Sequence, residues 1–332
     1  MKAGALYAIE SDGKQVGNPV RCGSDGVLAF EALAGAGVET VATLEEEERN
    51  EDTLSSQIAG FVHPRRGTVE KDDSGIFYWI HECTKCSNIS DAPLVVWLQG
   101  GPGASSLLGS LFEIGPLRFE EGAAAGSQPS SNPHAWNEKA NLVFIDQPFG
   151  TGFSYGDSPT DMPGMAKWLR IAIEQLSAAR PGHAGGARRP IWLTGESYAG
   201  KYIPYLATEI MSEGGELAER LRLGGLAIGD GWVNPELIVA SYPEFSYAHG
   251  LVDEKQREAM EHNVTLFRDA LRRGDNASAT DIEHSIEHFV ENVAGVNAYD
   301  VRHLGPYNFD AATGWWVVCL SWCGVFSLCV SN

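Results

Sequence analysis

Ser197 is the residue whose surroundings most clearly suggest chemistry. Residues 191–204 read IWLTGESYAGKYIP, in which a short apolar run stops at Gly195 and the serine follows two positions later. A serine at a sharp turn from a strand into a helix holds its hydroxyl above the end of a sheet, as in a nucleophile elbow. Such a turn needs small residues two positions to either side, and Gly195 and Ala199 supply them, although the general pattern has a second glycine and Gly200 comes one place late. The alternative interpretation is a serine in a strand-to-helix loop that caps the next helix.

A glycine-rich loop is the second feature that suggests chemistry. Residues 99–106, QGGPGASS, directly follow the apolar run LVVWL at 94–98. Successive glycines let backbone N–H groups converge on one point because no Cβ obstructs the approach, which is how an oxyanion hole is made. The lysine and Ser/Thr of a phosphate-binding loop and the spacing of a dinucleotide motif are both missing, so no nucleotide cofactor is predicted. A plain turn rich in glycine and proline is the alternative.

Composition narrows the classes of partner. The chain has 332 residues, 43% of them hydrophobic, and a formal net charge of −20. This length and apolar content suffice for one large α/β domain or two ordinary ones. Nucleic acid and anionic membrane are excluded as expected partners, because both need a basic protein surface. Cys83 and Cys86 form a lone C-x-x-C with no second pair at ligand spacing, so neither a zinc site nor a thioredoxin-like site is favoured, and no metal is predicted.

The compartment and the oligomeric state stay open at this point. Three glycosylation acceptor sequons, at Asn88, Asn263 and Asn276, fit a secreted or lumenal glycoprotein. The first residues, MKAGALYAIESDGK, contain no apolar region of the kind that a secretory signal requires. The sequence is therefore compatible with a missing entry signal or with a cytosolic protein.

The elements that must position these residues follow an alternating pattern. Apolar, β-branched runs predict a hairpin from 61–63 and 76–80 and strands at 94–98, 141–145, 191–194 and 223–228. Helical periodicity predicts a helix over 165–176 and another from 201, and strands alternating with helices predict an α/β fold with a mostly parallel sheet flanked by helices. After residue 235 the pattern turns helical, with one helix ending at Gly274 and another that a capping box of Thr280 and Glu283 should begin, so a lid is expected. The predicted division is an N-terminal flexible extension over 1–56, a core over 57–234, a helical lid over 235–313 and an apolar tail over 314–332.

Four segments carry a resemblance to a known family. They are WLQGGPGASSL (97–107), FIDQPFGTGFSY (144–155), LTGESYAGKYIP (193–204) and IGDGWVNPE (228–236). In this order they resemble the serine carboxypeptidases of the α/β-hydrolase superfamily, and the glutamine in WLQGGPG resembles the vitellogenic-type branch. The resemblance covers roughly residues 58–306. It implies an α/β-hydrolase fold with a helical lid, no cofactor, peptide or protein C-termini as partners, and a secretory, vacuolar-lysosomal or extracellular compartment.

The resemblance also implies roles for individual residues. Ser197 would be the nucleophile that attacks the last peptide carbonyl, and the backbone N–H groups of Gly101 and Tyr198 would hold the oxyanion. Recognition of the substrate's terminal carboxylate would fall to Trp97, Gln99, Glu113 and Glu196, with Gln99 where many relatives carry asparagine. A glutamate can donate a hydrogen bond to that carboxylate only when it is protonated, so burial and a second glutamate nearby should raise its pKa.

The downstream sequence departs from the family pattern. The fold's triad has the chain order Ser, Asp, His, but His249 in YAHGLVD and His303 in RHLGP do not match the family's catalytic histidine, and no catalytic Asp or His is assigned. The uncharged tail 314–332 is expected to be an incorrect or read-through terminus that replaces the final strands, Asp and His, with a membrane tail anchor as the alternative. We therefore expect a serine carboxypeptidase that is inactive or weak as given. The alternatives are a carboxypeptidase-like acyltransferase that uses the same Ser197 ester, and a non-catalytic peptide-binding protein.

Overall fold

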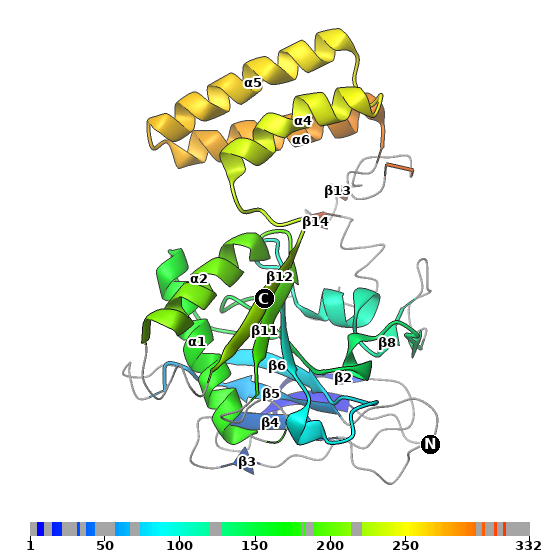
Figure 1. Ribbon diagram of the computed structural model, residues 1–332, viewed down its shortest axis with the longest axis vertical. Coiled ribbons are helices and arrows are strands. Elements are labelled where there is room, and N and C mark those ends of the chain that lie inside the picture. The colour runs from blue at the N-terminus through cyan, green and yellow to red at the C-terminus, as the bar shows by residue number, and fades with distance from the viewer. Residues whose placement is uncertain are drawn as a thin grey trace. The chain divides into compact units, whose positions relative to one another are not determined.

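The computed structural model describes residues 57–66, 74–119, 128–180, 182, 189–213, 221–296 and 301–302, together with the backbone of several short strands outside these ranges. The chain divides into two compact units, Met1–Val233 and Asn234–Asn332, and each is described by itself. Figure 1 shows the elements of both units. Three small antiparallel pairs stand apart from the main sheet: β1 (Ala5–Ile9) with β2 (Gln15–Arg21), β8 (Leu117–Arg118) with β9 (Ser130–Ser131), and β13 (Phe309–Asp310) with β14 (Trp315–Trp316).

The first unit is built on an eight-stranded sheet with the order β12-β11-β7-β10-β6-β5-β4-β3. One half, from β12 to β10, is parallel, and the other half, from β10 to β3, is antiparallel. The strands are β3 (Ala32–Leu33), β4 (Val38–Thr43), β5 (Gln57–Val62), β6 (Ile76–His81), β7 (Leu94–Leu98), β10 (Asn141–Ile145), β11 (Ile191–Glu196) and β12 (Leu223–Gly229).

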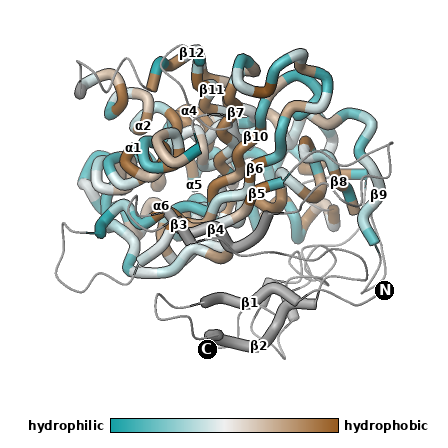
Figure 2. Tube along the Cα trace, turned by 90° about the horizontal axis from the view of Figure 1, so that it is seen from below, coloured by the Kyte–Doolittle hydropathy of each residue, from teal (hydrophilic) through white to brown (hydrophobic). Residues whose placement is uncertain are grey.

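Burial follows the apolar runs that predicted these strands. All five residues of β10 are buried, and so are four of the five in β7, as expected for strands covered on both faces. Figure 2 shows hydrophobic residues gathered along β7, β10 and β11. The predicted hairpin is confirmed as β5 and β6, with Val62 opposite Ile76. Strands β3 and β4 were not predicted; they lie within 1–56, where the flexible extension stays a prediction, and β4 pairs with β5.

Strand β12 forms one end of the sheet and is less covered than its neighbours. None of its seven residues is buried, and Leu226 is 44% exposed. On the adjacent strand β11, the side chain of Trp192 alternates with buried neighbours and is 40% exposed. The parallel half of the sheet therefore ends in an apolar border that contacts water.

Two helices cover the sheet of the first unit. Helix α1 (Met162–Ala179) begins at Asp161, whose side chain accepts a hydrogen bond of 2.6 Å from the backbone N–H of Gly164, and it buries Leu169 and Ile173 at helical spacing. Helix α2 (Ala199–Glu213) packs against α1 and against β11 and β12. Both helices share one apolar core with the central strands, which fixes the ends of these strands relative to one another.

The described part of the second unit contains three helices: α4 (Pro235–Ala248), α5 (Glu254–Arg272) and α6 (Asn276–Ala294). The predicted helical pattern after residue 235 is confirmed, and the role of this unit as a lid stays a prediction. The capping box predicted at Thr280 is wrong, because α6 begins one turn earlier, where the side chain of Asp275 accepts from the backbone N–H of Ser278. Thr280 lies inside the helix and its hydroxyl donates to the carbonyl of Asn276 at 3.0 Å. None of the described helices is both long and apolar enough to cross a bilayer.

Candidate active site

Ser197 occupies a strained turn between β11 and α2. Its φ of 55° lies in the left-handed region, which a residue with a side chain rarely adopts. Two backbone hydrogen bonds hold this conformation. Ser197 N–H donates to the carbonyl of Gly229 at the end of β12 (3.1 Å), and Trp232 N–H in the following loop donates to the carbonyl of Ser197 (2.8 Å). The serine is partly exposed at the carboxyl end of the parallel strands. Its position fits the predicted elbow.

The small residues around the serine are required by contacts with neighbouring backbone. A Cβ on Gly195 would lie 2.1 Å from the carbonyl oxygen of Leu98 and 2.8 Å from the Cβ of the fully buried Ala199. A Cβ on Gly200 would lie 2.6 Å from the backbone nitrogen of Trp232. Two successive small residues therefore follow the serine, because Ala199 packs against Gly195 in β11 and Gly200 packs against the loop after β12.

The glycine-rich loop touches the elbow directly. A Cβ on Gly100 would lie 2.6 Å from the backbone nitrogen of Tyr198 and 2.8 Å from the Cβ of Ser197. Gly101 has a φ of +111°, which glycine adopts without strain. Within the described part of the chain, neither the N–H of Gly101 nor that of Tyr198 has a hydrogen-bond acceptor. Two unused backbone donors therefore flank the serine, as the predicted oxyanion hole requires.

Asp146, which the sequence analysis did not single out, anchors the glycine-rich loop. Its carboxylate is buried and accepts hydrogen bonds from the hydroxyl of Ser105 (2.6 Å), from Ser106 N–H (2.9 Å) and from Phe153 N–H (2.9 Å). Burial raises the pKa of Asp146 to about 6, against the opposing effect of these hydrogen bonds. The signal was its place directly after a buried strand, where the carboxyl end of the sheet gathers functional side chains.

The four residues predicted to recognise a carboxylate fall into one hydrogen-bonded cluster. The indole N–H of Trp97 donates to Oε1 of Gln99 (2.8 Å), and Nε2 of Gln99 donates to Oε1 of Glu196 (2.5 Å). Glu113 shares a side-chain hydrogen bond with Glu196. Trp97 and Gln99 are buried and the two glutamates are half-buried, so the carboxyl groups can be reached from solvent. Their roles in binding stay predictions.

The two glutamates are held in a state that favours a shared proton. Burial and then the negative charge of Glu196 raise the pKa of Glu113 to about 7, with Asp230 adding a smaller effect in the same direction. Burial also raises the pKa of Glu196, while its hydrogen bond from Gln99 acts the other way. At acidic pH the pair therefore carries a proton that it can donate to a bound anion.

The short helix η3 (Gly109–Glu113) brings Glu113 to this cluster. A Cβ on Gly109 would lie 2.3 Å from the indole nitrogen of Trp97, so the helix begins directly against that ring. At its other end, the side chain of Asn132 donates to the carbonyl of Glu113 at 2.8 Å. Glu113 is thus fixed by packing at one end of η3 and by a hydrogen bond at the other.

In the described part of the first unit, no histidine is hydrogen-bonded to Ser197. The ring of His249 lies within 2.8 Å of the carbonyl of Phe245 in the second unit, and His303 lies outside the described residues. His81 is buried in β6 beside the hydroxyl of Ser110 (3.2 Å), and burial lowers its pKa to about 3, so it stays neutral. Among the described residues of the first unit, the hydroxyl of Ser197 has no hydrogen bond to a histidine or an aspartate.

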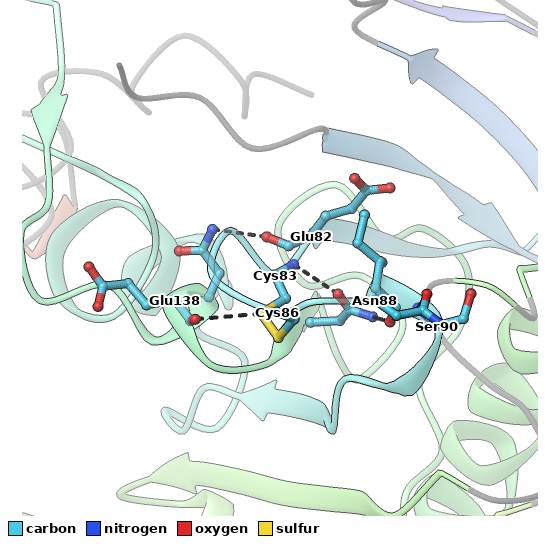
Figure 3. The surroundings of a disulfide bond; sticks show 9 residues. Glu82, Cys83, Cys86, Asn88, Ser90 and Glu138 are labelled. Atoms are coloured by element: carbon cyan, nitrogen blue, oxygen red, sulfur yellow. Dashed lines mark hydrogen bonds between the residues drawn. A yellow bond between two sulfur atoms is a disulfide. The ribbon is translucent and has the colours of Figure 1, made fainter. Parts of the chain in front are cut away.

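Cys83 and Cys86 form a disulfide, with Cα atoms 5.7 Å apart (Figure 3). The backbone N–H of Cys83 donates to Oδ1 of the buried Asn141 at 2.8 Å, and the side chain of Asn137 donates to the carbonyl of Glu82 at 3.1 Å. The sequence analysis did not predict this bond, although the spacing allows it. Within the described ranges, no three His, Cys, Asp or Glu side chains are grouped so that they could hold a metal ion.

Comparison with known proteins identifies the fold and the family. The structure of Kex1, a prohormone-processing carboxypeptidase from Saccharomyces cerevisiae, matches 84% of this chain with a TM-score of 0.65 and 25% identity, and the match covers 62% of that structure. The class is therefore the α/β-hydrolase fold, as predicted. The family model described as serine carboxypeptidase matches residues 48–312. The chain belongs to the serine carboxypeptidase family, which confirms the resemblance.

Curated relatives agree with this family. Serine carboxypeptidase-like 50 of Arabidopsis thaliana is 35% identical over 247 residues, which are 71% of this chain and 53% of that protein. The pheromone-processing carboxypeptidase kex1 of Aspergillus niger is 33% identical over 256 residues, which are 73% of this chain and 40% of that protein. The chain thus spans about half the length of these relatives.

Proposed function

We propose that this chain carries the nucleophile and the carboxylate-binding half of a serine-type carboxypeptidase, which releases C-terminal amino acids from peptides through an acyl-enzyme on Ser197. The observation that carries the proposal is the contact between Gly100 and the turn at Ser197. The loop that carries the N–H of Gly101 touches the turn that carries Glu196, Ser197 and the N–H of Tyr198. Membership of the serine carboxypeptidase family supports the same reaction class.

The proposed chemistry begins at the serine hydroxyl. Oγ of Ser197 attacks the carbonyl carbon of the last peptide bond and loses its proton to a base, while the carbonyl oxygen gains negative charge. The N–H groups of Gly101 and Tyr198 would stabilise that oxyanion. The C–N bond then breaks, the terminal amino acid leaves as an amine, and water hydrolyses the ester on Ser197.

Selection of a free C-terminus would come from the glutamate pair. A protonated Glu113 can donate to the substrate carboxylate, whereas two ionised glutamates would repel it. Since the pKa of Glu113 is raised to about 7, the donor is present below that pH and is lost as the pH rises through it. Gln99 and Trp97 would hold Glu196 in position through their hydrogen bonds.

The rate of hydrolysis depends on a base. The described residues of the first unit bring no histidine or aspartate into hydrogen-bond contact with the hydroxyl of Ser197. Without a base, the oxyanion hole and substrate binding alone leave a rate lower by on the order of 10⁶. We therefore propose weak or no turnover by these 332 residues together with retained binding of peptide C-termini.

Two assays on the full chain test this function. The first measures binding of an N-acetylated dipeptide and of its C-terminal amide at pH 5.5 and 8.5. We expect the free acid to bind more tightly than the amide at pH 5.5 and to lose that advantage at pH 8.5. Glu113→Gln keeps an uncharged donor at every pH, so its preference for the free acid should change less with pH. Equal binding of acid and amide by the unmodified chain at both pH values would refute the proposal.

The second assay follows the serine with a fluorophosphonate probe and a peptide substrate, with Ser197→Ala as the control. Labelling that disappears in the control, with release of an amino acid only from the free acid, supports a carboxypeptidase. Transfer to an added alcohol without hydrolysis would instead identify an acyltransferase. Carboxylate binding with no Ser197-dependent labelling would identify a peptide-binding protein without catalytic activity.

A further inference from the structure

Asp230, directly after β12, has a backbone conformation that calls for an explanation. Its φ is 37°, and within the described part of the chain Asp230 and Ser197 are the only residues other than glycine with positive φ. A left-handed residue with a side chain is uncommon, and aspartate and asparagine tolerate it best. The carboxylate of Asp230 is used neither by the proposed acyl transfer nor by the proposed binding of a peptide C-terminus.

Sheet register places Asp230 beside the glutamate pair. Gly229 lies opposite Glu196 in the parallel pairing of β11 with β12. Its carbonyl accepts from Ser197 N–H, and Trp232 N–H donates back to the carbonyl of Ser197. Asp230 is therefore held between two residues that are both hydrogen-bonded to the elbow, and its side chain is exposed at the same end of the sheet as Glu196.

The polar groups around the pair come from four elements, three of which carry a carboxyl group. Glu113 comes from η3, Glu196 from β11 and Asp230 from the loop after β12, while Gln99 after β7 contributes a neutral amide. The negative charge of Asp230 acts on both glutamates in the direction that favours their protonated forms. The ammonium of Lys201 on α2 is exposed and donates to the carbonyl of Val233 at 3.1 Å.

We propose that Asp230 is a positioning residue for the carboxylate site: its negative charge keeps a proton on the Glu113–Glu196 pair, so that the pair can donate a hydrogen bond to a peptide carboxylate. This inference rests on the proposed function, because it assigns the pair to carboxylate binding. It extends that function, because Asp230 acts through the glutamates and not on the substrate.

The physical reason is like-charge repulsion at a partly buried site. When the pair loses its shared proton, the new negative charge must form next to Asp230, so deprotonation is displaced to higher pH. The bare charge of Asp230 also repels an incoming carboxylate, which opposes binding at every pH. The two effects separate in a pH titration, since only the first moves the midpoint.

The test measures dissociation constants between pH 5 and pH 9. All proteins are the full chain with Ser197→Ala, so that the N-acetylated dipeptide is not consumed. Asp230→Asn removes the charge, keeps the shape and tolerates the left-handed backbone. Asp157→Asn removes an equal charge from an exposed loop position that does not act on the pair, and serves as the matched control.

We expect Asp230→Asn to move the pH midpoint of peptide binding down by about half a pH unit or more, as a like charge acting through a partly solvated site predicts. At pH 5 its affinity should equal or exceed that of the parent. Relative to pH 5, its affinity should fall below that of the parent by about twofold near pH 7 and by about threefold at pH 8, as a shift of half a pH unit requires. Asp230→Glu should restore the midpoint of the parent. The Asp157→Asn control should keep it.

Three outcomes would overturn the inference. An unchanged midpoint in Asp230→Asn would mean that its charge does not control the proton on the pair. A uniform loss of affinity at all pH values would mean that Asp230 only supports the structure of the turn. If the parent binds acid and amide equally at every pH, the proposed carboxylate site fails first and the inference fails with it. The amide control therefore tells the two failures apart.

Discussion

Replacing Gly100 with alanine tests whether the contact between the glycine-rich loop and the elbow is as close as the structure has it. The added methyl group would lie 2.6 Å from Tyr198 N, 2.8 Å from the carbonyl oxygen of Glu196 and 2.8 Å from the Cβ of Ser197. All three distances are shorter than a carbon atom tolerates, and two of the three atoms belong to the backbone. No side chain can rotate away to make room, so the loop or the turn must move.

The expected loss of stability follows from overpacking, because the atoms around Gly100 cannot move away without a shift of the backbone. Inserting one methyl group into well-packed surroundings costs about 1–3 kcal/mol, and occasionally more. We expect Gly100→Ala to lower the free energy of unfolding by at least the lower value. A displacement of the Tyr198 N–H by about 1 Å would in addition lower any Ser197-dependent labelling by on the order of 100-fold.

Gly229→Ala is the matched control at the same site. Its Cβ would lie 3.8 Å from the Cβ of Glu196 and 3.9 Å from the carbonyl oxygen of Gly195, which are ordinary contacts, and its φ is not in the left-handed region. Replacing a strand glycine with alanine should leave stability unchanged or raise it by about 0.5–1 kcal/mol. Urea denaturation followed by tryptophan fluorescence measures both variants. Our argument would be refuted if Gly100→Ala were as stable as the parent, or if both variants lost the same amount.

Two further predictions concern the supports of the site. Asp146→Asn should lower the free energy of unfolding by about 1–3 kcal/mol, because one carboxylate oxygen accepts from Ser105 and Ser106 and the other from Phe153 N–H, and an amide has only one oxygen. The exposed Asp157→Asn should change it by no more than about 0.5 kcal/mol. The pKa of Asp146 in the folded state is raised to about 6, so its protonation stabilises the fold fully below the unfolded value of 3.8, and this stabilisation is lost as the pH rises through 6. The free energy of unfolding should therefore increase from pH 7 to pH 5 by less in Asp146→Asn than in the parent. An equal increase in both proteins would contradict this. Reducing the Cys83–Cys86 bond, or replacing both cysteines by serine, opens a loop of only four residues. This should lower the free energy of unfolding in urea by at most about 2 kcal/mol, and complete unfolding on reduction alone would show that the bond does more than close this loop.

The central strands could be predicted because their local pattern and their tertiary environment agree. The runs at 94–98 and 141–145 are apolar throughout, and β7 and β10 lie between neighbours on both edges. Strand β4 was missed because its sequence, VETVAT, alternates only weakly, and its pairing with β5 depends on contacts that no local pattern contains. The start of α6 was misplaced for a related reason: two capping signals lie five residues apart, at Asp275 and Thr280, and the earlier one caps the helix.

The candidate site could also be predicted only in part from the sequence. Ser197 and the glycines could be found because a sharp turn constrains residue types at fixed spacing. The carboxylate cluster could be predicted only through the family resemblance, since Gln99 and Glu196 are 97 positions apart in the chain. Asp146 and Asp230 were missed, because the burial of one and the left-handed backbone of the other become apparent only in the folded chain.

The exposed edge strand β12 should affect how the purified protein associates in solution. Leu226 and Trp192 expose apolar side chains next to the edge of β12, whose backbone groups can form hydrogen bonds to another strand. Two folded copies could pair edge to edge through these strands without unfolding first. The rate of association should therefore rise with protein concentration, and Leu226→Lys should slow it.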